Sequence, residues 1–418
     1  MTHPRNFRIL HLFLTSGCNL GCSYCFQYHQ RPVSMDWATL RAAIDLSFTT
    51  DHPTIELAFT GGEPLLEFDL LCRGVRYATE KVPAEKELKL TLMTNGLLLR
   101  EDVVAFCERH GIDTRLSFDG LPPAQETRAA GTFRRLDRFL GGLRRVHPIF
   151  FRDRLRVSIT LPPAGVPVLA DSVAYFLGHE VAEIAIAPTL DAPGGWSCDR
   201  VPVLEEAFNR IFALSLSHLR EKCSVPVLFL RKPEWSRLQT TPPVVGGRKA
   251  GAAGSSEEPR HDRGSHAPRP MCGVLSGESL TVDTDGQVHA CLLFARANRQ
   301  AQAPFLQDEI AGLGIASVSD PDFQRRYHEF IEAHLEPPTF SGKQNKYSSL
   351  GRCRECRFYN SCVLCPVSIG LIPENRDPNR VPDFYCAFNM ISLRYRELFP
   401  PQPRRVALAG RPVRQSTA

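Results

Sequence analysis

Three cysteines near the N-terminus have a spacing that suits an iron–sulfur cluster. Cys18, Cys22 and Cys25 lie in the run TSGCNLGCSYCFQYH, with three and then two residues between them. Cysteine thiolates are the usual ligands of such clusters, so one short loop can bind three irons of a four-iron cubane. The fourth iron then keeps an open position, where a substrate or cofactor can coordinate. The spacing therefore predicts a catalytic cluster.

A zinc site is the alternative interpretation of this triplet, because His29 follows it closely. Zinc sites usually take their ligands from two separated pairs of residues rather than from one triplet. The iron–sulfur interpretation is therefore the stronger one.

Glycine-rich or polar segments follow the next three apolar runs of the chain. They are Thr60–Pro64 (TGGEP), Thr94–Gly96 (TNG) and Ser117–Gly120 (SFDG). In a barrel of parallel strands, the loops at the carboxyl ends gather on one face, where active sites are found. Adjacent glycines allow close approach of the backbone to a ligand, and carbonyl groups there can accept hydrogen bonds from an ammonium group. We therefore expect a cofactor site beside the cysteine loop.

The C-terminal third holds seven more of the chain's fourteen cysteines. No secretory signal is recognisable, and in a reducing compartment metal ligation is the expected use of clustered cysteines. Iron–sulfur clusters are one possibility, and one or two zinc sites are another. These cysteines are Cys272, Cys291, Cys353, Cys356, Cys362, Cys365 and Cys386. The remaining four, which are Cys72, Cys107, Cys198 and Cys223, lie singly and are interpreted as buried or inert thiols.

An alternation of strands and helices must position the cysteine loop. Amphipathic stretches of helical length, such as Met35–Phe48, Leu66–Lys81 and Glu101–His110, lie between short apolar runs. This alternation predicts parallel strands joined by crossover helices, and six units favour an incomplete (β/α)6 barrel within the α/β class. The predicted strands are Arg8–Leu14, Thr54–Phe59, Leu88–Met93, Thr114–Phe118, Leu155–Leu161 and Val181–Pro188.

Composition divides the chain into a barrel and a small cysteine-rich domain. The barrel is predicted over 5–220 and the cysteine-rich domain over 271–399, with a connecting segment at 221–238 between them. Leu280–Val282 and Val288–Cys291 flank the turn DTDG and predict a β-hairpin. Residues 239–270 have few large apolar side chains and predict a disordered linker, and residues 400–418 predict a flexible tail.

The overall composition suits a cytoplasmic protein. Apolar residues make up 43% of the chain, and the formal charge of +5 comes from cations that are spread along it. We therefore expect neither nucleic acid nor a membrane as a partner.

Together, the loop CNLGCSYC and the strand-end segments resemble the radical S-adenosylmethionine (radical SAM) superfamily over the first half of the chain. The resemblance implies that Cys18, Cys22 and Cys25 hold a [4Fe-4S] cluster that reductively cleaves SAM to a 5′-deoxyadenosyl radical.

The resemblance also implies a role for individual strand-end residues. Gly61, Gly62, Glu63 and Pro64 would bind the methionine amino group, Ser117 would contact the nucleotide, and Arg128 would pair with the methionine carboxylate. Thr94, Asn95 and Asp119 would line the same cofactor site. The resemblance assigns no catalytic acid or base.

The C-terminal cysteines resemble the SPASM extension of radical SAM enzymes that modify peptides and proteins. The matching elements are Gly286-x4-Cys291 and the CxxCxxxxxC run that starts at Cys353. The resemblance implies one auxiliary cluster on Cys353, Cys356, Cys362 and Cys386. It implies a second on Cys272, Cys291 and Cys365, with an iron that lacks a cysteine ligand. Two residues separate Cys362 from Cys365 where three are usual, which leaves the nuclearity of the second cluster open.

The pairing of these two regions implies a maturase that forms a thioether or carbon–carbon crosslink in a ribosomally made peptide. The implied partners are a precursor peptide and an electron donor such as flavodoxin or ferredoxin. Because the first predicted strand starts near the N-terminus, leader recognition is expected from the barrel, from the cluster domain or from a separate leader-binding protein.

The sequence leaves other functions open. A sulfatase-maturing, formylglycine-forming enzyme would carry an Asp base directly after the second hairpin cysteine, where this chain has Leu292. Heterocycle or epimer formation on a peptide is a further possibility. A zinc-stabilised binding protein without catalysis is the alternative of another class.

Overall fold

The computed structural model describes residues 7–25, 27, 32–190, 196–232, 277–295, 314–333, 342–370, 375 and 377–401. His29, Cys272, the predicted linker at 239–270 and residues 402–418 of the predicted tail lie outside these ranges.

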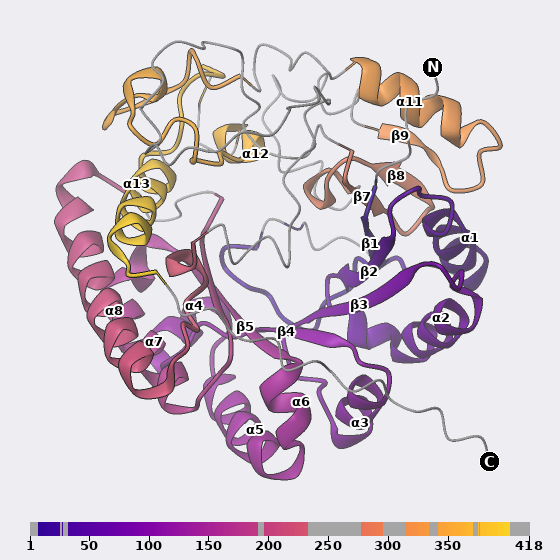
Figure 1. The fold of residues 1–418 in the computed structure, drawn as a ribbon, viewed down its shortest axis with the longest axis horizontal. Coiled ribbons are helices and arrows are strands. Elements are labelled where there is room, and N and C mark those ends of the chain that lie inside the picture. The colour runs from indigo at the N-terminus through magenta and orange to yellow at the C-terminus, as the bar shows by residue number, and fades with distance from the viewer. Residues whose placement is uncertain are drawn as a thin grey trace, which may run out of the picture.

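Six parallel strands form an open arc at the centre of the molecule, as the sequence predicts (Figure 1). Strands β1 to β6 are neighbours in chain order, and the sheet is not closed by pairing of β6 with β1. Every predicted strand overlaps an observed one. The strands are β1 (Ile9–Thr15), β2 (Thr54–Gly61), β3 (Glu87–Thr94), β4 (Asp113–Ser117), β5 (Leu155–Leu161) and β6 (Ile184–Pro188).

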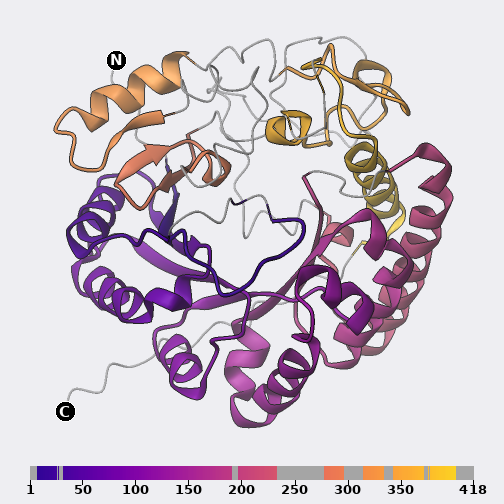
Figure 2. The same cartoon turned by 180° about the vertical axis from the view of Figure 1, so that it is seen from behind.

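Helices cover the outer side of this arc (Figures 1 and 2). The first begins at Asp36, whose carboxylate accepts a hydrogen bond from the backbone N–H of Thr39 and caps the helix. The helices are α1 (Trp37–Ser47), α2 (Phe68–Lys81), α3 (Glu101–Arg109), α4 (Pro122–Arg128), α5 (Phe133–Val146), α6 (Pro148–Asp153), α7 (Leu169–Gly178) and α8 (Val201–Lys222).

Alternating side chains orient the strands between the helices and the interior of the arc. In β5, Leu155 and every second residue after it are buried in the main hydrophobic core. Arg156, Ser158 and Thr160 alternate with them and are only half-buried. Because neighbouring side chains of a strand point to opposite faces, these polar residues face the interior of the arc.

The C-terminal region extends the sheet beyond β1. Strand β7 (Ser279–Val282) pairs in parallel with β1, and β8 (Gln287–His289) and β9 (Gly314–Ser317) follow antiparallel. The predicted hairpin of β7 and β8 is confirmed, with a turn in which Gly286 adopts a φ of +82°. The further elements are α11 (Phe323–Ala333), β10 (Tyr347–Ser348), β11 (Gly351–Arg352), α12 (Pro366–Gly370) and α13 (Asp383–Leu398).

The same region also contacts the other end of the arc. Helix α13 packs against α8, where the rings of Phe208 and Phe388 lie 5.3 Å apart. Phe212 and Tyr395 make a similar contact at 5.4 Å. The C-terminal region therefore contacts both β1 and α8, and Figure 2 shows its described elements on the two sides of the opening of the arc. Among the described residues, no helix combines the length and apolar character needed to span a bilayer.

Candidate active site

The three N-terminal cysteines lie together on the loop that follows β1. The pKa of each thiol is raised above its usual value, and burial is the largest cause of this shift. The charge of Cys22 also raises the pKa of Cys18, that of Cys25 raises the pKa of Cys22, and that of Cys18 raises the pKa of Cys25. The three sulfur atoms are therefore within electrostatic range of one another.

Their arrangement differs from that of ligands around a single ion. Within the described ranges, no three His, Cys, Asp or Glu side chains lie close enough to hold one metal ion. In a cubane cluster each cysteine ligates a different iron, so the thiolates surround the cluster rather than meet at one atom. A loop that carries three neighbouring thiols suits that donor set.

The glycine segment after β2 lies directly against the cysteine loop. The backbone N–H of Gly62 donates to the carbonyl of Thr15 at 2.7 Å, and that of Glu63 donates to Gly17 at 2.8 Å. A Cβ atom on Gly62 would lie 2.1 Å from the Gly17 carbonyl oxygen. On Gly61, whose φ is +139°, it would lie 2.4 Å from that of Thr15. Both glycines are therefore required for this contact.

The Glu63 side chain joins the loops after β2 and β3. It is completely buried, and burial raises the pKa of its carboxyl group. It accepts hydrogen bonds from the Thr94 hydroxyl and the Asn95 backbone N–H, both at 2.8 Å, and from the Leu65 backbone N–H at 3.1 Å. The Asn95 side chain then donates to Asn19 in the cysteine loop at 2.7 Å. Thr94 and Asn95 are thus held beside the cysteines.

A buried ion pair occupies the adjoining part of the site. Arg128 donates from Nη2 and Nε to the two carboxylate oxygens of Asp119 at 2.8 and 3.1 Å. Asp119 exposes 2% of its surface and Arg128 exposes 8%. Asp119 also accepts from the Tyr24 hydroxyl and from the Thr160 backbone N–H, and Arg128 Nη2 also donates to the Thr160 hydroxyl at 3.2 Å. The predicted cofactor residues Asp119 and Arg128 therefore bind each other.

Ser117 differs from these residues in its contacts. It is half-buried at the carboxyl end of β4, and its hydroxyl makes no hydrogen bond to another described residue. A hydroxyl group at the end of a strand is available to a ligand on that face.

Four of the C-terminal cysteines gather at a second place, which we call the four-cysteine site: Cys353, Cys356, Cys362 and Cys386. Burial is the main cause that raises the pKa of Cys353 to about 11 and that of Cys362 to about 12. The charges of Cys356 and Cys386 add to both shifts. The structure thus brings together the four residues that the sequence grouped. Cys353, Cys362 and Cys386 pack on a small core of Leu364, Ile369 and Val381.

The other cysteines of the chain have different surroundings. Cys291 and Cys365 are partly buried against the main core instead of the small one. Cys72 and Cys107 are buried, and burial raises their pKa values to about 11 and about 12, as expected of inert thiols. Cys223 is exposed and follows α8. Cys198 is half-buried and lies close to Cys386. The pKa of Cys386 is raised mainly by burial, and the charge of Cys198 adds to this shift.

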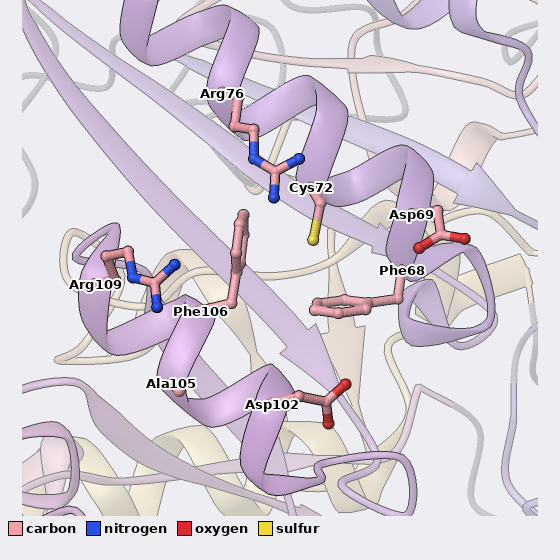
Figure 3. Close-up of a pocket in the computed structure, with 8 residues that line it drawn as sticks. All are labelled: Phe68, Asp69, Cys72, Arg76, Asp102, Ala105, Phe106 and Arg109. Carbon is pink, nitrogen blue, oxygen red and sulfur yellow. The ribbon is translucent and has the colours of Figure 1, made fainter.

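A surface pocket lies elsewhere, between α2 and α3 (Figure 3). Helix α2 supplies Phe68, Asp69, Cys72 and Arg76, and α3 supplies Asp102, Ala105, Phe106 and Arg109. None of the residues that line this pocket belongs to the strand-end segments or to either group of cysteines.

Comparison with known proteins identifies part of the N-terminal half. Residues 12–168 match the model of the radical SAM superfamily. This part of the chain is a radical SAM domain. The matched range contains the cysteine loop, Gly61–Pro64, Asn95 and the Asp119–Arg128 pair.

Individual proteins resemble the chain to different extents. An uncharacterized protein of Methanocaldococcus jannaschii is 34% identical over 113 residues, which cover 27% of this chain. The match spans 39% of the length of that curated relative.

Two solved structures share the fold over most of the chain. Native anSMEcpe with bound AdoMet and Kp18Cys peptide has a TM-score of 0.64 and 16% identity, covering 93% of this chain and 96% of that one. Streptococcus suis SuiB bound to precursor peptide SuiA has a TM-score of 0.53 and 13% identity, covering 91% and 76%.

Several residues of the radical SAM domain were missed by the sequence analysis. Tyr24 lies between Cys22 and Cys25 in the sequence and contacts Asp119, and its place inside the cysteine motif was the available signal. Thr160 lies near the end of the predicted strand Leu155–Leu161, where the sequence predicts no site residue. The Gln27 side chain donates to the Gly61 carbonyl at 2.9 Å, so that carbonyl already has a partner within the protein.

Proposed function

We propose that this protein is a radical SAM enzyme that modifies a ribosomally made peptide by oxidative thioether or carbon–carbon crosslinking. The observation that carries the proposal is the presence of two separate groups of thiols. One lies among the strand-end loops of a radical SAM domain, and the other lies in the C-terminal region, which contacts both β1 and α8.

Cys18, Cys22 and Cys25 would hold the catalytic cluster. When bound, this cluster and SAM supply a 5′-deoxyadenosyl radical that takes a hydrogen atom from the substrate. The fixed backbone of Gly61–Pro64 would bind the methionine amino group. Ser117, whose hydroxyl has no partner among the described residues, would contact the nucleotide. Asn95 contacts the cysteine loop and would keep the cofactor next to the cluster.

Arg128 would contribute to the same site as a positioned cation. Its bidentate contact with Asp119 fixes the guanidinium plane, since two parallel hydrogen bonds define its orientation. The proposed role toward the methionine carboxylate is therefore shared with Asp119, which sets where the positive charge lies. Tyr24 joins the same pair to the cysteine loop.

The C-terminal region would be a SPASM-like domain with two auxiliary clusters. The four-cysteine site would provide a complete set of thiolates for one cluster. Cys272, Cys291 and Cys365 would hold the other and leave one iron open to a substrate thiolate. An electron donor of the flavodoxin or ferredoxin type would reduce the catalytic cluster in the cytoplasm.

Crosslinking removes two hydrogens from the peptide. One would leave as a hydrogen atom and the other as a proton, and the remaining electron would need an acceptor, a role that an auxiliary cluster held by the C-terminal cysteines would supply. Structural similarity supports a peptide substrate, because the two solved structures compared above each contain a bound peptide. Leu292, which has no acid–base group, argues against oxidation of a side chain to formylglycine.

The test is to co-express the enzyme with a short peptide encoded beside its gene and to weigh the product by mass spectrometry. We expect a loss of two mass units per crosslink, which disappears in Cys272→Ala or Cys291→Ala enzyme. An unmodified peptide together with formylglycine formation on a sulfatase fragment would overturn the proposal.

A further inference from the structure

The outer face of α5 carries a line of arginines. The helix has the sequence FRRLDRFLGGLRRV, which contains five arginines and a single acidic residue. Arg134, Arg138 and Arg145 are exposed and follow one another at intervals of four and seven residues, so they share one face of the helix. We call these three residues the arginine stripe. A Cβ atom on Gly141, which lies on the same face, would meet no other part of the described structure within 4 Å, so the surface between Arg138 and Arg145 is open.

Buried leucines orient the arginine stripe away from the barrel. Leu136, Leu140 and Leu143 are buried and follow one another at intervals of four and three residues. At 3.6 residues per turn, they lie on the side of α5 that is opposite to the stripe. Because α5 belongs to the outer layer of helices (Figure 1), the arginine side chains point toward solvent.

Within the described part of the chain, no carboxylate forms an ion pair with the arginine stripe. Arg138 donates to a backbone carbonyl of its own helix at 3.2 Å. The one acidic residue of the helix, Asp137, accepts a hydrogen bond from the Tyr175 hydroxyl at 2.7 Å. Arg144, at the edge of the stripe, pairs with Glu180 instead. Three neighbouring cations of this kind create a local positive potential that attracts an anionic partner.

The first turn of α5 lies against the loop that follows β3. A Cβ atom on Gly96 in this loop would lie 3.0 Å from Leu136 Cδ2. The Arg135 guanidinium donates a hydrogen bond to the carbonyl of Leu97. The end of the helix that begins the arginine stripe therefore contacts a strand-end loop of the radical SAM domain.

Further hydrogen bonds connect this loop to the N-terminal cysteines. The backbone N–H of Leu97 donates to Asn95 Oδ1 at 3.0 Å. Asn95 Nδ2 in turn donates to Asn19 Oδ1 at 2.7 Å and lies 3.9 Å from Cys18 Sγ. A short series of contacts thus leads from the first turn of α5 to a cysteine of the proposed catalytic cluster.

We propose that the arginine stripe is the docking surface for the electron donor of the catalytic cluster, a carrier protein of the flavodoxin or ferredoxin type with an acidic surface. The inference rests on the proposed function, since it requires a cluster at Cys18, Cys22 and Cys25. One electron passes from the carrier to the cluster, and no bond is made or broken. Opposite charges steer the two proteins together. The contacts with the cysteine loop favour this partner over a nucleic acid or an anionic membrane, because neither of these has to lie near the cluster.

The experiment compares the holoprotein with a variant that combines Arg134→Gln, Arg138→Gln and Arg145→Gln. The probe is a purified flavodoxin of net negative charge. Isothermal titration measures its Kd. Chromatography measures the rate of 5′-deoxyadenosine formation, once with limiting reduced flavodoxin and once with dithionite, a small reductant that needs no protein docking surface.

We expect the triple glutamine variant to bind flavodoxin about tenfold more weakly at low ionic strength, because electrostatic steering is lost. The ratio of the rate with flavodoxin to the rate with dithionite should fall by a similar factor. The difference in Kd should shrink at about 1 M salt, where the screening length is only about 3 Å.

Two further variants separate local charge from other effects. Lysine at all three positions (Arg134→Lys, Arg138→Lys and Arg145→Lys) retains the charge and should bind flavodoxin like the parent. The matched control removes three exposed cations from α1, α2 and α11, and its Kd should stay close to that of the parent. Its substitutions are Arg41→Gln, Lys81→Gln and Arg325→Gln.

Absence of flavodoxin binding to the parent, or equal Kd values for the parent and the triple glutamine variant, would overturn the proposal. An equal loss of binding in the matched control would also overturn it, since only net charge would then matter. Weaker binding without a fall in the ratio of the two rates would show that flavodoxin docks there without delivering its electron, which contradicts the proposal.

Two other outcomes are distinguishable from these. A single-stranded oligonucleotide that binds the parent more tightly than flavodoxin does, and loses binding in the triple glutamine variant, would identify a nucleic-acid surface instead. If the parent forms no 5′-deoxyadenosine with dithionite, the proposed function itself fails. Formation of 5′-deoxyadenosine with dithionite, together with unchanged flavodoxin binding in the variant, would refute the docking surface alone.

Discussion

The cysteine loop of the barrel and the four-cysteine site differ in how their thiols are brought together. The barrel loop takes all three cysteines from eight consecutive residues, and neighbouring strand-end loops hold it through hydrogen bonds from Gly62 and Glu63. The four-cysteine site combines residues 353–362 with Cys386 on α13. Under the proposed function, the first arrangement would leave one side of a cluster open for chemistry, whereas the second would enclose a cluster and suit electron transfer.

The two places also differ in the apolar core that supports them. The barrel loop follows β1, whose Leu10, Leu12 and Leu14 belong to the main core, and this core extends to α13. The four-cysteine site is built on a small separate core of Leu364, Ile369 and Val381. A core of this size stabilises little on its own, so a metal bound at the proposed site would contribute to the folding of the region.

The largest effect should follow removal of the metal. We expect that chelation of iron makes the segment between Lys343 and Cys386 sensitive to protease, because its small core cannot offset the cost of ordering the chain. The barrel should resist cleavage under the same conditions. Limited proteolysis with mass mapping measures both at once. Cleavage that begins within β2 to β5 would contradict the expected difference in stability between the barrel and the four-cysteine site.

The buried ion pair of the barrel site should give the next largest effect. Asp119→Ala leaves the Arg128 guanidinium buried without its carboxylate, which should lower the free energy of unfolding by about 3–5 kcal/mol. Denaturant unfolding is the measurement. Asp113→Ala is the matched control, since its pair with Arg154 is more than two-fifths exposed and should contribute at most about 1 kcal/mol. Equal losses of unfolding free energy in the two variants would show that the buried pair contributes no more to stability than the exposed pair.

Glu63→Gln should have a smaller effect. The amide group cannot accept all three hydrogen bonds that the carboxylate receives, so one buried donor loses its partner at a cost of about 1–3 kcal/mol. The loops after β2 and β3 should loosen and SAM should bind more weakly, as measured by isothermal titration. Glu67→Gln, whose carboxylate binds only the exposed Ser34 hydroxyl among described residues, is the control. Weaker binding in the control alone would contradict this role of Glu63.

The smallest effect is expected from shortening residues 241–268. The segment has few apolar side chains to bury, and the cost of loop closure changes slowly with loop length. Iron content and melting temperature should therefore stay close to those of the full chain. A marked loss of iron would show that these residues contribute to the folded structure.

The sequence predicts the features that depend on neighbouring residues. Apolar residues locate all six barrel strands, and Leu155–Leu161 matches β5 at both ends, because buried and half-buried residues alternate along the whole strand. The spacing of Cys18, Cys22 and Cys25 likewise predicts their proximity, since one short loop cannot separate them far.

Features that depend on tertiary contacts cannot be predicted from the local sequence. No local pattern shows that Arg128 binds Asp119, because the contact arises only after β4 and α4 are placed together. Lys343 and Lys346 resemble ordinary surface lysines in the sequence, and only their burial distinguishes them. The pairing of β7 with β1 joins residues that are far apart in the chain.

Cleavage of SAM tests the central claim most directly. Anaerobically reconstituted protein should convert SAM to 5′-deoxyadenosine under a strong reductant, as measured by chromatography. Cys18→Ala, Cys22→Ala and Cys25→Ala combined should abolish this product while the iron of the four-cysteine site remains. Undiminished production of 5′-deoxyadenosine by the triple variant would contradict the assignment of these three cysteines to the catalytic cluster.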